Sequence, residues 1–218
     1  MKRTILTLLL LLTALCPMAA QQQKTVQRSS IPLAFPEFMD AKVLQPFGRS
    51  VKARANIFLK NSALLFVQDG QVMQANIDRV LGVEFDSIKY MKVSSEQMGR
   101  VVAQKGYNYL LRVTTIDMDK YSAEVTGGEN LPYLDLSDMG VFLEIDSDSQ
   151  KWEEDYGYPL QNKYYFSIQG KIIPANESNF KKYVKPEMKK AFKRLMNDHY
   201  WSWTDEDSLM QLFVYLEE

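Results

Sequence analysis

The sequence predicts an α+β protein: an antiparallel β-meander, curled into a sheet or a small barrel, with C-terminal helices packed on it. Three observations support this prediction. Apolar residues alternate with polar ones from Val51 to Leu59, which is the period of a β-strand with one buried face. Two-residue turn signals recur at short intervals after this strand. Two apolar stripes of helical period then complete the chain.

The first twenty residues have the layout of a secretory signal peptide and are set apart from the fold. Lys2 and Arg3 form a positive start, followed by an apolar run over 5–15 and by small residues just before Gln21. We therefore expect a signal peptide at 1–20 and a mature chain without a transmembrane segment. We expect export to the periplasm or the cell surface of a Gram-negative bacterium.

The single cysteine, Cys16, lies inside this leader. A bacterial lipoprotein site usually has a small residue directly before the cysteine and an aliphatic residue two positions further upstream. Those positions hold Leu15 and Thr13, so we expect plain cleavage near Ala20 rather than a lipoprotein. The mature chain then has no thiol for a disulfide, and its core alone must stabilise it.

Length and composition are those of a globular protein of one domain or two small ones. The chain has 218 residues, a formal net charge of −1, 46% hydrophobic residues and 24% charged residues. These values give neither the basic electrostatic footprint of a nucleic-acid-binding protein nor the composition of a disordered chain. We therefore expect no nucleic-acid partner.

Residues 21–47 are predicted to form an extended N-terminal arm, because Pro32, Pro36 and Pro46 lack the backbone donor that helices and strands need. We expect its aromatic residues to lie in surface grooves of the domain. Donation of a strand from this arm to the sheet edge of a partner stays open as an alternative. Residues 48–218 are predicted to form a single α+β domain, with its parts at 50–118 (β-meander), 124–160 (acidic loop region) and 162–218 (hairpin and two helices).

Three hairpins are predicted to follow the first strand of the meander. Asp-Gly between two strand-like runs is a strong hairpin signal, because both residue types tolerate positive φ. Turns at such short spacing favour an antiparallel sheet over βαβ units. The predicted turns and flanking strands are Asp69-Gly70 (63–68 and 71–77), Asp86-Ser87 (80–85 and 88–93) and Lys105-Gly106 (100–104 and 107–118).

The segment from Glu129 to Asp155 carries nine acids against one base, Lys151. We interpret it as loops, and loops on a rigid scaffold commonly carry function. The part that starts at Asp146 and Asp148 begins like a calcium loop, but it lacks the third oxygen ligand and the glycine of the sharp turn. We therefore expect a solvated acidic loop there and no metal site.

A last hairpin and a first helix follow the acidic segment. Strand-like runs at 164–168 and 171–173 flank the turn Gln169-Gly170. Pro186 suits the first turn of a helix, and the apolar residues from Met188 to Met196 form one stripe.

Thr204 is the expected N-cap of the second helix, and acidic residues follow it where the helix dipole favours negative charge. The apolar stripes of both helices are too short to stabilise isolated helices. We therefore expect Phe192 and Phe213 to pack on the odd-numbered face of the strand from Val51 to Leu59.

A basic run covers 181–194, with seven lysine and arginine residues. Lys185, Lys189 and Lys193 step by four, away from the apolar stripe, which is the pattern of a solvated helix face. Whether this run binds an anionic partner is left open.

Several features together resemble uncharacterised exported proteins of Bacteroidetes-type bacteria. They are the leader followed by Gln21-Gln22-Gln23, the strands from Phe58 to Ile77 and the ending from Tyr164 through the helices. The resemblance covers most of the mature chain and implies export. It brings no characterised activity, and no functional residue is carried over.

Few side chains in the sequence suit catalysis by histidine or cysteine. His199 is the only histidine, whereas a zinc site needs several histidine or cysteine ligands. We therefore assign no catalytic, cofactor-binding or metal-binding residue and expect no cofactor. The leading hypothesis is a non-enzymatic binding or accessory module that contacts an envelope protein or a glycan. The alternative is a carboxylate-dependent hydrolase of envelope or dietary glycans, with its acids drawn from Glu129 to Asp155.

Overall fold

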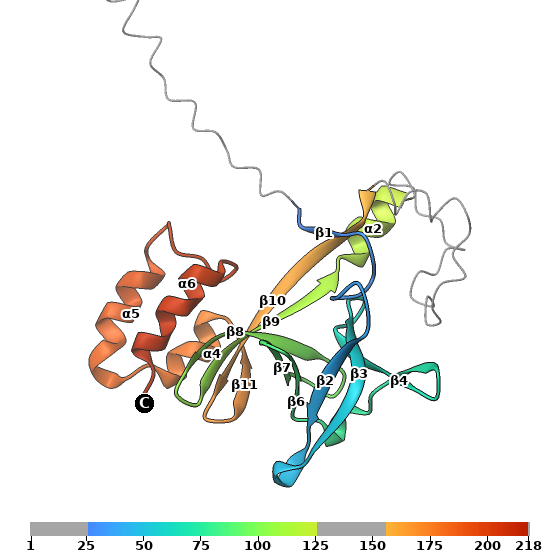
Figure 1. The fold of residues 1–218 in the computed structure, drawn as a ribbon. Coiled ribbons are helices and arrows are strands. Elements are labelled where there is room, and N and C mark those ends of the chain that lie inside the picture. Colours follow the sequence, from blue (N-terminus) through green and yellow to red (C-terminus); the bar gives the residue numbers. More distant parts are fainter. Residues whose placement is uncertain (1–25, 126–155, 218) are drawn as a thin grey trace, which may run out of the picture.

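The computed structural model describes residues 26–125 and 156–217. The backbone forms one curled antiparallel sheet of eleven strands, with the C-terminal helices at one end of its longest strands and a separate short helix at the other end (Figure 1). This is the α+β class that the sequence predicts. The signal peptide, Cys16 and the acidic segment from Glu129 to Asp155 lie outside the described residues.

The strands are β1 (Arg28–Ser29), β2 (Met39–Leu44), β3 (Ser50–Phe58), β4 (Ala63–Gln68), β5 (Gln71–Gln74), β6 (Gly82–Phe85), β7 (Ile88–Lys92), β8 (Met98–Lys105), β9 (Asn108–Ile116), β10 (Tyr158–Ile168) and β11 (Lys171–Pro174). The helices are α2 (Met118–Val125), α4 (Glu177–Phe180), α5 (Lys189–Met196) and α6 (Glu206–Met210), with 3₁₀ turns at η1 (Pro46–Gly48), η2 (Ile77–Arg79), η4 (Lys181–Tyr183), η5 (Pro186–Met188) and η6 (Gln211–Tyr215).

The sheet consists of two meanders joined edge to edge. Its strand order is β1-β10-β9-β8-β7-β6-β2-β3-β4-β5, and β11 pairs with the far end of β10. After β5 the chain returns through η2 and places β6 beside β2. A strand that returns to lie beside the first of a consecutive set forms a Greek-key connection.

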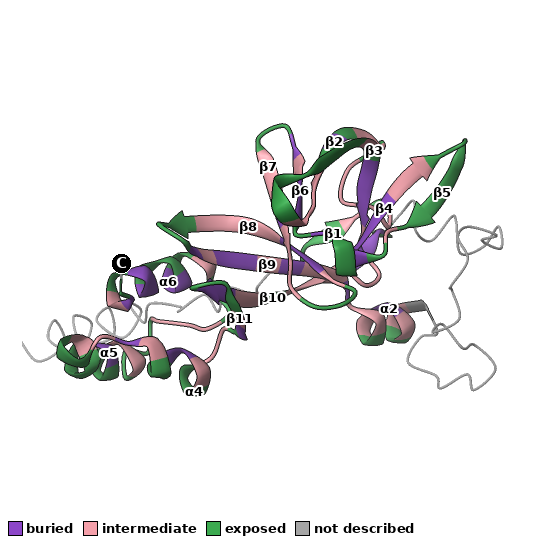
Figure 2. Cartoon of the chain, turned by 90° about the horizontal axis from the view of Figure 1, so that it is seen from below, coloured by how far each residue is buried: buried purple, intermediate pink, exposed green. Residues whose placement is uncertain are grey.

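All four predicted hairpins are confirmed. Asp69, Asp86 and Gln169 have positive φ angles of 51°, 50° and 52° at the turns after β4, β6 and β10. At the turn after β8, Gly106 has a φ of 59°. The prediction for 71–77 is wrong in part, because β5 stops at Gln74 and all four of its residues are exposed (Figure 2).

The predicted arm contains a central strand of the sheet. Residues 39–44 form β2, which pairs with β3 on one side and with β6 on the other. Upstream of β2, residues 32–34 run along the end of β3, where the Ala34 amide donates to the Ile57 carbonyl at 2.9 Å. The arm is therefore part of the sheet at two places, through β1 at one edge and through β2 in the middle.

Asn56 bridges the gap in pairing between residues 32–34 and β2. It is fully buried, although the alternation in β3 predicts a solvent-facing position. Its Nδ2 donates to the carbonyls of Phe35 and Glu37 at 2.9 and 3.0 Å, and its Oδ1 accepts from the amides of Phe35 and Ile57 at 3.2 and 2.8 Å. The side chain thus satisfies backbone groups that no neighbouring strand reaches.

The curl of the sheet is closed by the connection from β3 to β4. The Ser62 hydroxyl donates to the Met98 carbonyl at 2.7 Å, and the Met98 amide donates back to the Ser62 carbonyl at 2.8 Å. The Ile116 amide donates to the Leu59 carbonyl at 2.7 Å. These bonds join the ends of β8 and β9 to the opposite part of the sheet and make a half-barrel.

Three hydrophobic clusters lie along this sheet. The curl core lies inside the half-barrel and contains Ile57, Val83 and Phe85, with Phe35 of the arm packed at 4.9 Å from the Phe85 ring. The helix core lies between the ends of β9 to β11 and the C-terminal helices. A smaller cluster joins Tyr121 of α2 to the start of β10.

The C-terminal helices do not pack on the odd-numbered face of β3, contrary to our expectation. Phe192 and Phe213 are buried in the helix core, where Phe213 lies 5.9 Å from Phe166 of β10. The face of β3 that carries Ala55 and Ile57 is already covered inside the curl. The helices therefore cover the far end of the sheet (Figure 1).

The N-cap of the second helix is Asp205 rather than Thr204. The Asp205 carboxylate accepts the Ser208 amide at 2.8 Å, whereas the Thr204 hydroxyl lies 3.0 Å from the Ser202 hydroxyl. Sequence spacing also missed α2, which follows β9 directly. Residue Asp117 marks its start, because its carboxylate accepts the Lys120 amide at 3.1 Å.

Candidate functional site

A row of polar side chains crosses the sheet between the curl core and the helix core. Tyr90 of β7 pairs with Arg100 of β8, Arg100 pairs with Arg112 of β9, and Arg112 pairs with Tyr164 of β10. Residues directly opposite each other in antiparallel strands point to the same face. We call these four residues and Glu206 of α6, which contacts Arg112 and Tyr164, the arginine junction.

Glu206 ties the row to the C-terminal helices. Its Oε2 accepts from Arg112 Nη1 at 2.8 Å and from the Tyr164 hydroxyl at 3.4 Å. The side chains of Arg112 and Glu206 are 24% and 31% exposed. Water and salt therefore screen this partly buried ion pair less than they screen a fully exposed one. The contact is brought about by the fold rather than by proximity along the chain, since Arg112 and Glu206 are 94 positions apart in the sequence.

The junction has two cations and one carboxylate. Like charges directly opposite each other across two strands are destabilising, and Arg100 and Arg112 occupy such a pair of positions. Glu206 balances Arg112, but Arg100 forms no ion pair with any residue that the structure describes. The Nε atom of Arg112 is buried and donates no hydrogen bond to any atom of residues 26–125 and 156–217. Within the described residues, one positive charge at the junction is therefore without an opposite charge in contact.

The tyrosine hydroxyls at the junction keep their protons at neutral pH. Burial raises the pKa of Tyr164 above its ordinary value of 10.0, and the Glu206 carboxylate raises it further, against the opposing effect of Arg112. Burial also raises the pKa of Tyr90, which Arg100 and Arg112 partly oppose. Both hydroxyls are therefore hydrogen-bond donors in the neutral pH range.

His199, the single histidine, lies on the surface beyond α5. Its ring centroid is 4.1 Å from that of Tyr200, which is 86% exposed. Within residues 26–125 and 156–217, no group of three or more histidine, cysteine or acidic residues is placed to hold a metal ion. The acidic loop at Asp146 and Asp148 lies outside those residues.

The basic run at 181–194 lies on and around α5, mostly exposed to solvent. None of its lysine and arginine side chains forms an ion pair within the described residues. Lys189 and Lys193 face water while Phe192 faces the helix core, as the stripe pattern predicts.

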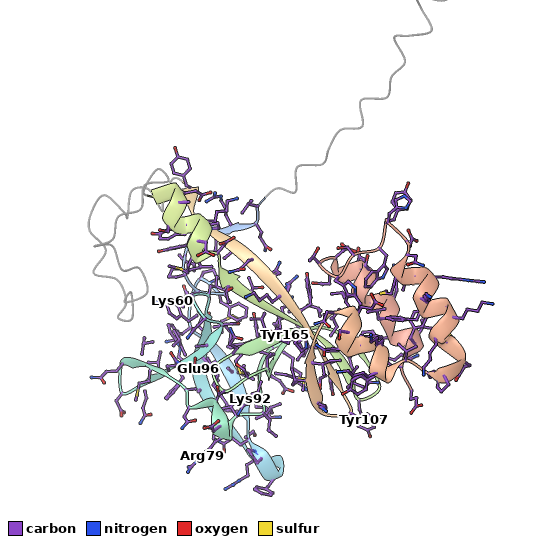
Figure 3. All side chains as sticks on the ribbon, turned by 180° about the vertical axis from the view of Figure 1, so that it is seen from behind. Lys60, Arg79, Lys92, Glu96, Tyr107 and Tyr165 are labelled. Carbon is purple, nitrogen blue, oxygen red and sulfur yellow. The ribbon has the colours of Figure 1, made fainter. Side chains whose placement is uncertain are left out.

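The tryptophans near the helix connection serve packing in this structure. Trp201 and Trp203 meet edge to face at 4.7 Å and contact the helix core. The Trp201 indole donates to the Ser208 carbonyl at 3.1 Å. Among the aromatic residues that remain outside a core, Tyr107 is 86% exposed at the tip between β8 and β9 (Figure 3).

Sequence reasoning missed the arginine junction. One signal was present: Arg112 shares a face of β9 with Leu110 and Ile116, both buried, and with the polar Asn108 and Thr114. A charged side chain beside buried apolar residues needs a partner. Which residue opposes it depends on the bulge between Val101 and Ala103, and the sequence pattern does not reveal that bulge.

Comparisons with known proteins assign this chain to no family. No protein-family model, no curated protein and no solved structure matches it. Within the described residues, none of the helices has the length and apolar character required to cross a membrane.

Proposed function

We propose that this protein is an exported, non-enzymatic binding module of the cell envelope, in the periplasm or at the cell surface. The leader supports export, with Lys2 and Arg3 before the apolar run at 5–15. The arginine junction supports the binding role, and the uncompensated charge at Arg100 is the observation that carries it.

The groups at the junction are suited to recognition. Guanidinium groups bind carboxylates and phosphates through planar, charge-assisted hydrogen bonds. Tyr90 and Tyr164 supply hydroxyl donors that are protonated at neutral pH, and burial moves the pKa of each still further from that range. A protonated tyrosine donates a hydrogen bond to an anion and is a poor general base.

The alternative function is a carboxylate-dependent glycan hydrolase. That chemistry needs two carboxyl groups about 5–10 Å apart across a cleft. Of the junction residues, only Glu206 carries a carboxylate, and it is engaged with Arg112. The acids proposed for the hydrolase belong to Glu129 to Asp155, outside the described residues, so an activity assay separates the two functions.

The test uses the purified mature chain with two envelope components, peptidoglycan and lipopolysaccharide. The protein should pellet with one of them in a saturable manner and should release no reducing sugar from either. Release of reducing ends would overturn the non-enzymatic proposal and establish the hydrolase. Absence of saturable binding to both components, combined with retention of the leader in cells, would overturn the envelope-module proposal.

A further inference from the structure

The charge imbalance at the arginine junction indicates the kind of ligand that would fit there. Arg100 and Arg112 lie directly opposite each other on β8 and β9, which brings their Cβ atoms to about 5 Å from one another. Both arginines are close enough to Tyr90 to lower its pKa against the effect of burial. Tyr90, Arg100, Arg112 and Tyr164 therefore lie side by side in one row on one face of the sheet.

The structure also contains an internal example of the occupant. The Glu206 carboxylate accepts from Arg112 at 2.8 Å and from Tyr164 at 3.4 Å. The junction thus already binds one carboxylate, supplied by α6. Arg100 has no corresponding partner among the described residues.

The junction differs from the other basic surface of the molecule. The side chains of Lys189, Lys193 and Arg194 on α5 are exposed, and water and salt screen exposed charges strongly. Arg100 and Arg112 are half-buried, so their interaction with an anion is screened less. Hydrogen-bond donors from Tyr90 and Tyr164 accompany the arginines, whereas α5 carries no such set.

We infer that Arg100 and Arg112 together bind one anionic group of a ligand, a carboxylate or a phosphate, in competition with the Glu206 carboxylate. This inference rests on the proposed binding function and names the chemical class of its ligand. Binding would neutralise the second guanidinium. Because Glu206 belongs to α6, it would also weaken one of the contacts that hold the C-terminal helices to the sheet.

The first test measures binding to small probes by titration calorimetry and thermal melting of the full mature chain. Sodium phosphate and sodium citrate are the probes, and sodium chloride at equal ionic strength is the control for screening. At concentrations up to about 10 mM, a range that detects millimolar affinities, one probe should bind saturably and raise the melting temperature. No saturable binding of either probe to the wild-type protein would overturn the inference.

Substitutions then locate the site. Arg100→Gln should abolish probe binding, while Arg194→Gln, the same change on the exposed face of α5, should leave it unchanged. Glu206→Gln keeps the shape of the side chain and removes the competing charge, so it should bind the probe about two- to fivefold more tightly, within the range of a half-exposed ion pair. A purely structural ion pair would instead lower stability in Glu206→Gln without any gain in affinity, and that result would overturn the competition.

A folding control and a source control complete the experiment. If Arg100→Gln does not fold, Arg100→Lys retains the charge without the planar fork, and it should bind the probe more weakly than wild type while it melts cooperatively. Unchanged binding in Arg100→Lys would overturn the inference. Competition by lipopolysaccharide that is lost when its phosphates are removed would identify a phosphate as the natural group, and competition by peptidoglycan a carboxylate. If Arg100→Gln still pellets with the same envelope component as wild type, the binding module stands and this site assignment fails.

Discussion

Asn56 illustrates at the residue scale how one side chain joins two segments that the backbone alone leaves apart. It makes three side-chain hydrogen bonds to the backbone of Phe35 and Glu37 and a fourth to the Ile57 amide. A buried amide with all its donors and acceptors paired is favourable only while its partners stay in place. The placement of residues 35–37 against β3 therefore depends on this one side chain.

Asn56→Ala should lower the free energy of unfolding by about 3 kcal/mol, because it leaves several buried backbone groups without partners. Asn76→Ala is the control, since Asn76 is exposed and accepts one amide, that of Asp78, at 3.0 Å. Its cost should be about 0.5–1 kcal/mol, typical of a weak cap. Urea melts of both variants measure the difference, and equal losses would show that the arm is held by other contacts.

The raised pKa of Tyr164 leads us to expect a decline in the stability of the protein at alkaline pH. Because burial and Glu206 raise its pKa in the folded state, the folded protein holds this proton more tightly than the unfolded chain does. The stability that Tyr164 contributes is complete below the unfolded pKa of 10.0 and is lost as pH rises through the raised folded pKa. Tyr90 acts with the same sign.

Tyr164→Phe should therefore show a shallower loss of stability above pH 10.0 than wild type, as measured by urea melts at stepwise pH. The double variant with Tyr90→Phe should flatten the curve further. Curves of equal slope for wild type and both variants would mean that these hydroxyls do not govern the alkaline transition.

At the scale of secondary-structure elements, the packing of the C-terminal helices on the far end of the sheet should contribute strongly to stability. Phe213→Ala should lower the free energy of unfolding by about 3–5 kcal/mol, because Phe213 is buried at 7% exposure. Lys189→Ala should change it by less than about 0.5 kcal/mol, as for an exposed position. Chemical denaturation measures both.

A double-mutant cycle shows which strand the helices contact. Phe213→Ala and Phe166→Leu should be coupled by about 0.5–1.5 kcal/mol, because their rings meet edge to face at 5.9 Å. Phe213→Ala and Ile57→Val should be additive within about 0.5 kcal/mol. The reverse pattern would restore the packing on β3 that the sequence suggested.

The pairing of β1 with β10 makes a second prediction at this scale. A Cβ at Gly157 would lie 2.8 Å from the Ser29 carbonyl oxygen, whereas a Cβ at Gly106 would meet nothing within 4 Å. Both glycines have positive φ, 66° and 59°, so Gly→Ala at either position carries the left-handed penalty of about 1–2 kcal/mol. The difference between the two variants isolates the clash.

Gly157→Ala should therefore lose at least about 1 kcal/mol more stability than Gly106→Ala. Limited proteolysis should also cut near residue 30 faster in Gly157→Ala. Identical protection in both variants would show that β1 is held by the Arg28 contacts rather than by strand pairing. Those contacts are a 2.7 Å ion pair with Glu124 and a 2.9 Å bond to the Gly157 carbonyl.

Local signals in the sequence predicted the elements whose structure is set locally. The Asp69-Gly70 and Gln169-Gly170 hairpins are confirmed because a two-residue turn determines the pairing of its flanking strands. β2 was missed because its partners are set by the Greek-key return to β6, and because Pro36 and Pro46 lie just outside it. The arginine junction was missed for a related reason, since a bulge in β8 decides which residue faces Arg112.

The part of the chain that the structure describes forms one sheet with two main cores, and the arginine junction lies between them. The curl core, the charged junction and the helix core follow one another along the same face of the sheet. A change at Arg112 or Glu206 therefore affects how the C-terminal helices are held, even though both cores stay intact. If an anion binds at the junction as we propose, its binding and the stability of the C-terminal helices are coupled there.

Export is the prediction that concerns the entire chain. N-terminal sequencing of protein recovered from cells should begin close to Gln21, because the small residues Ala19 and Ala20 precede it. The protein that starts at Met1 would contradict the signal peptide. A lipid on Cys16 would show instead that the protein is a lipoprotein.

The register of β1 has a consequence for the order in which the chain can fold. Arg28 donates to the Gly157 carbonyl across 129 residues of sequence, and within the described residues β1 pairs with β10 alone. A chain that emerges from its N-terminus cannot complete this edge until β10 has followed. Such long-range contacts slow folding. The first strand of the sheet therefore waits unpaired while the strands from β2 to β9 can already form their hairpins.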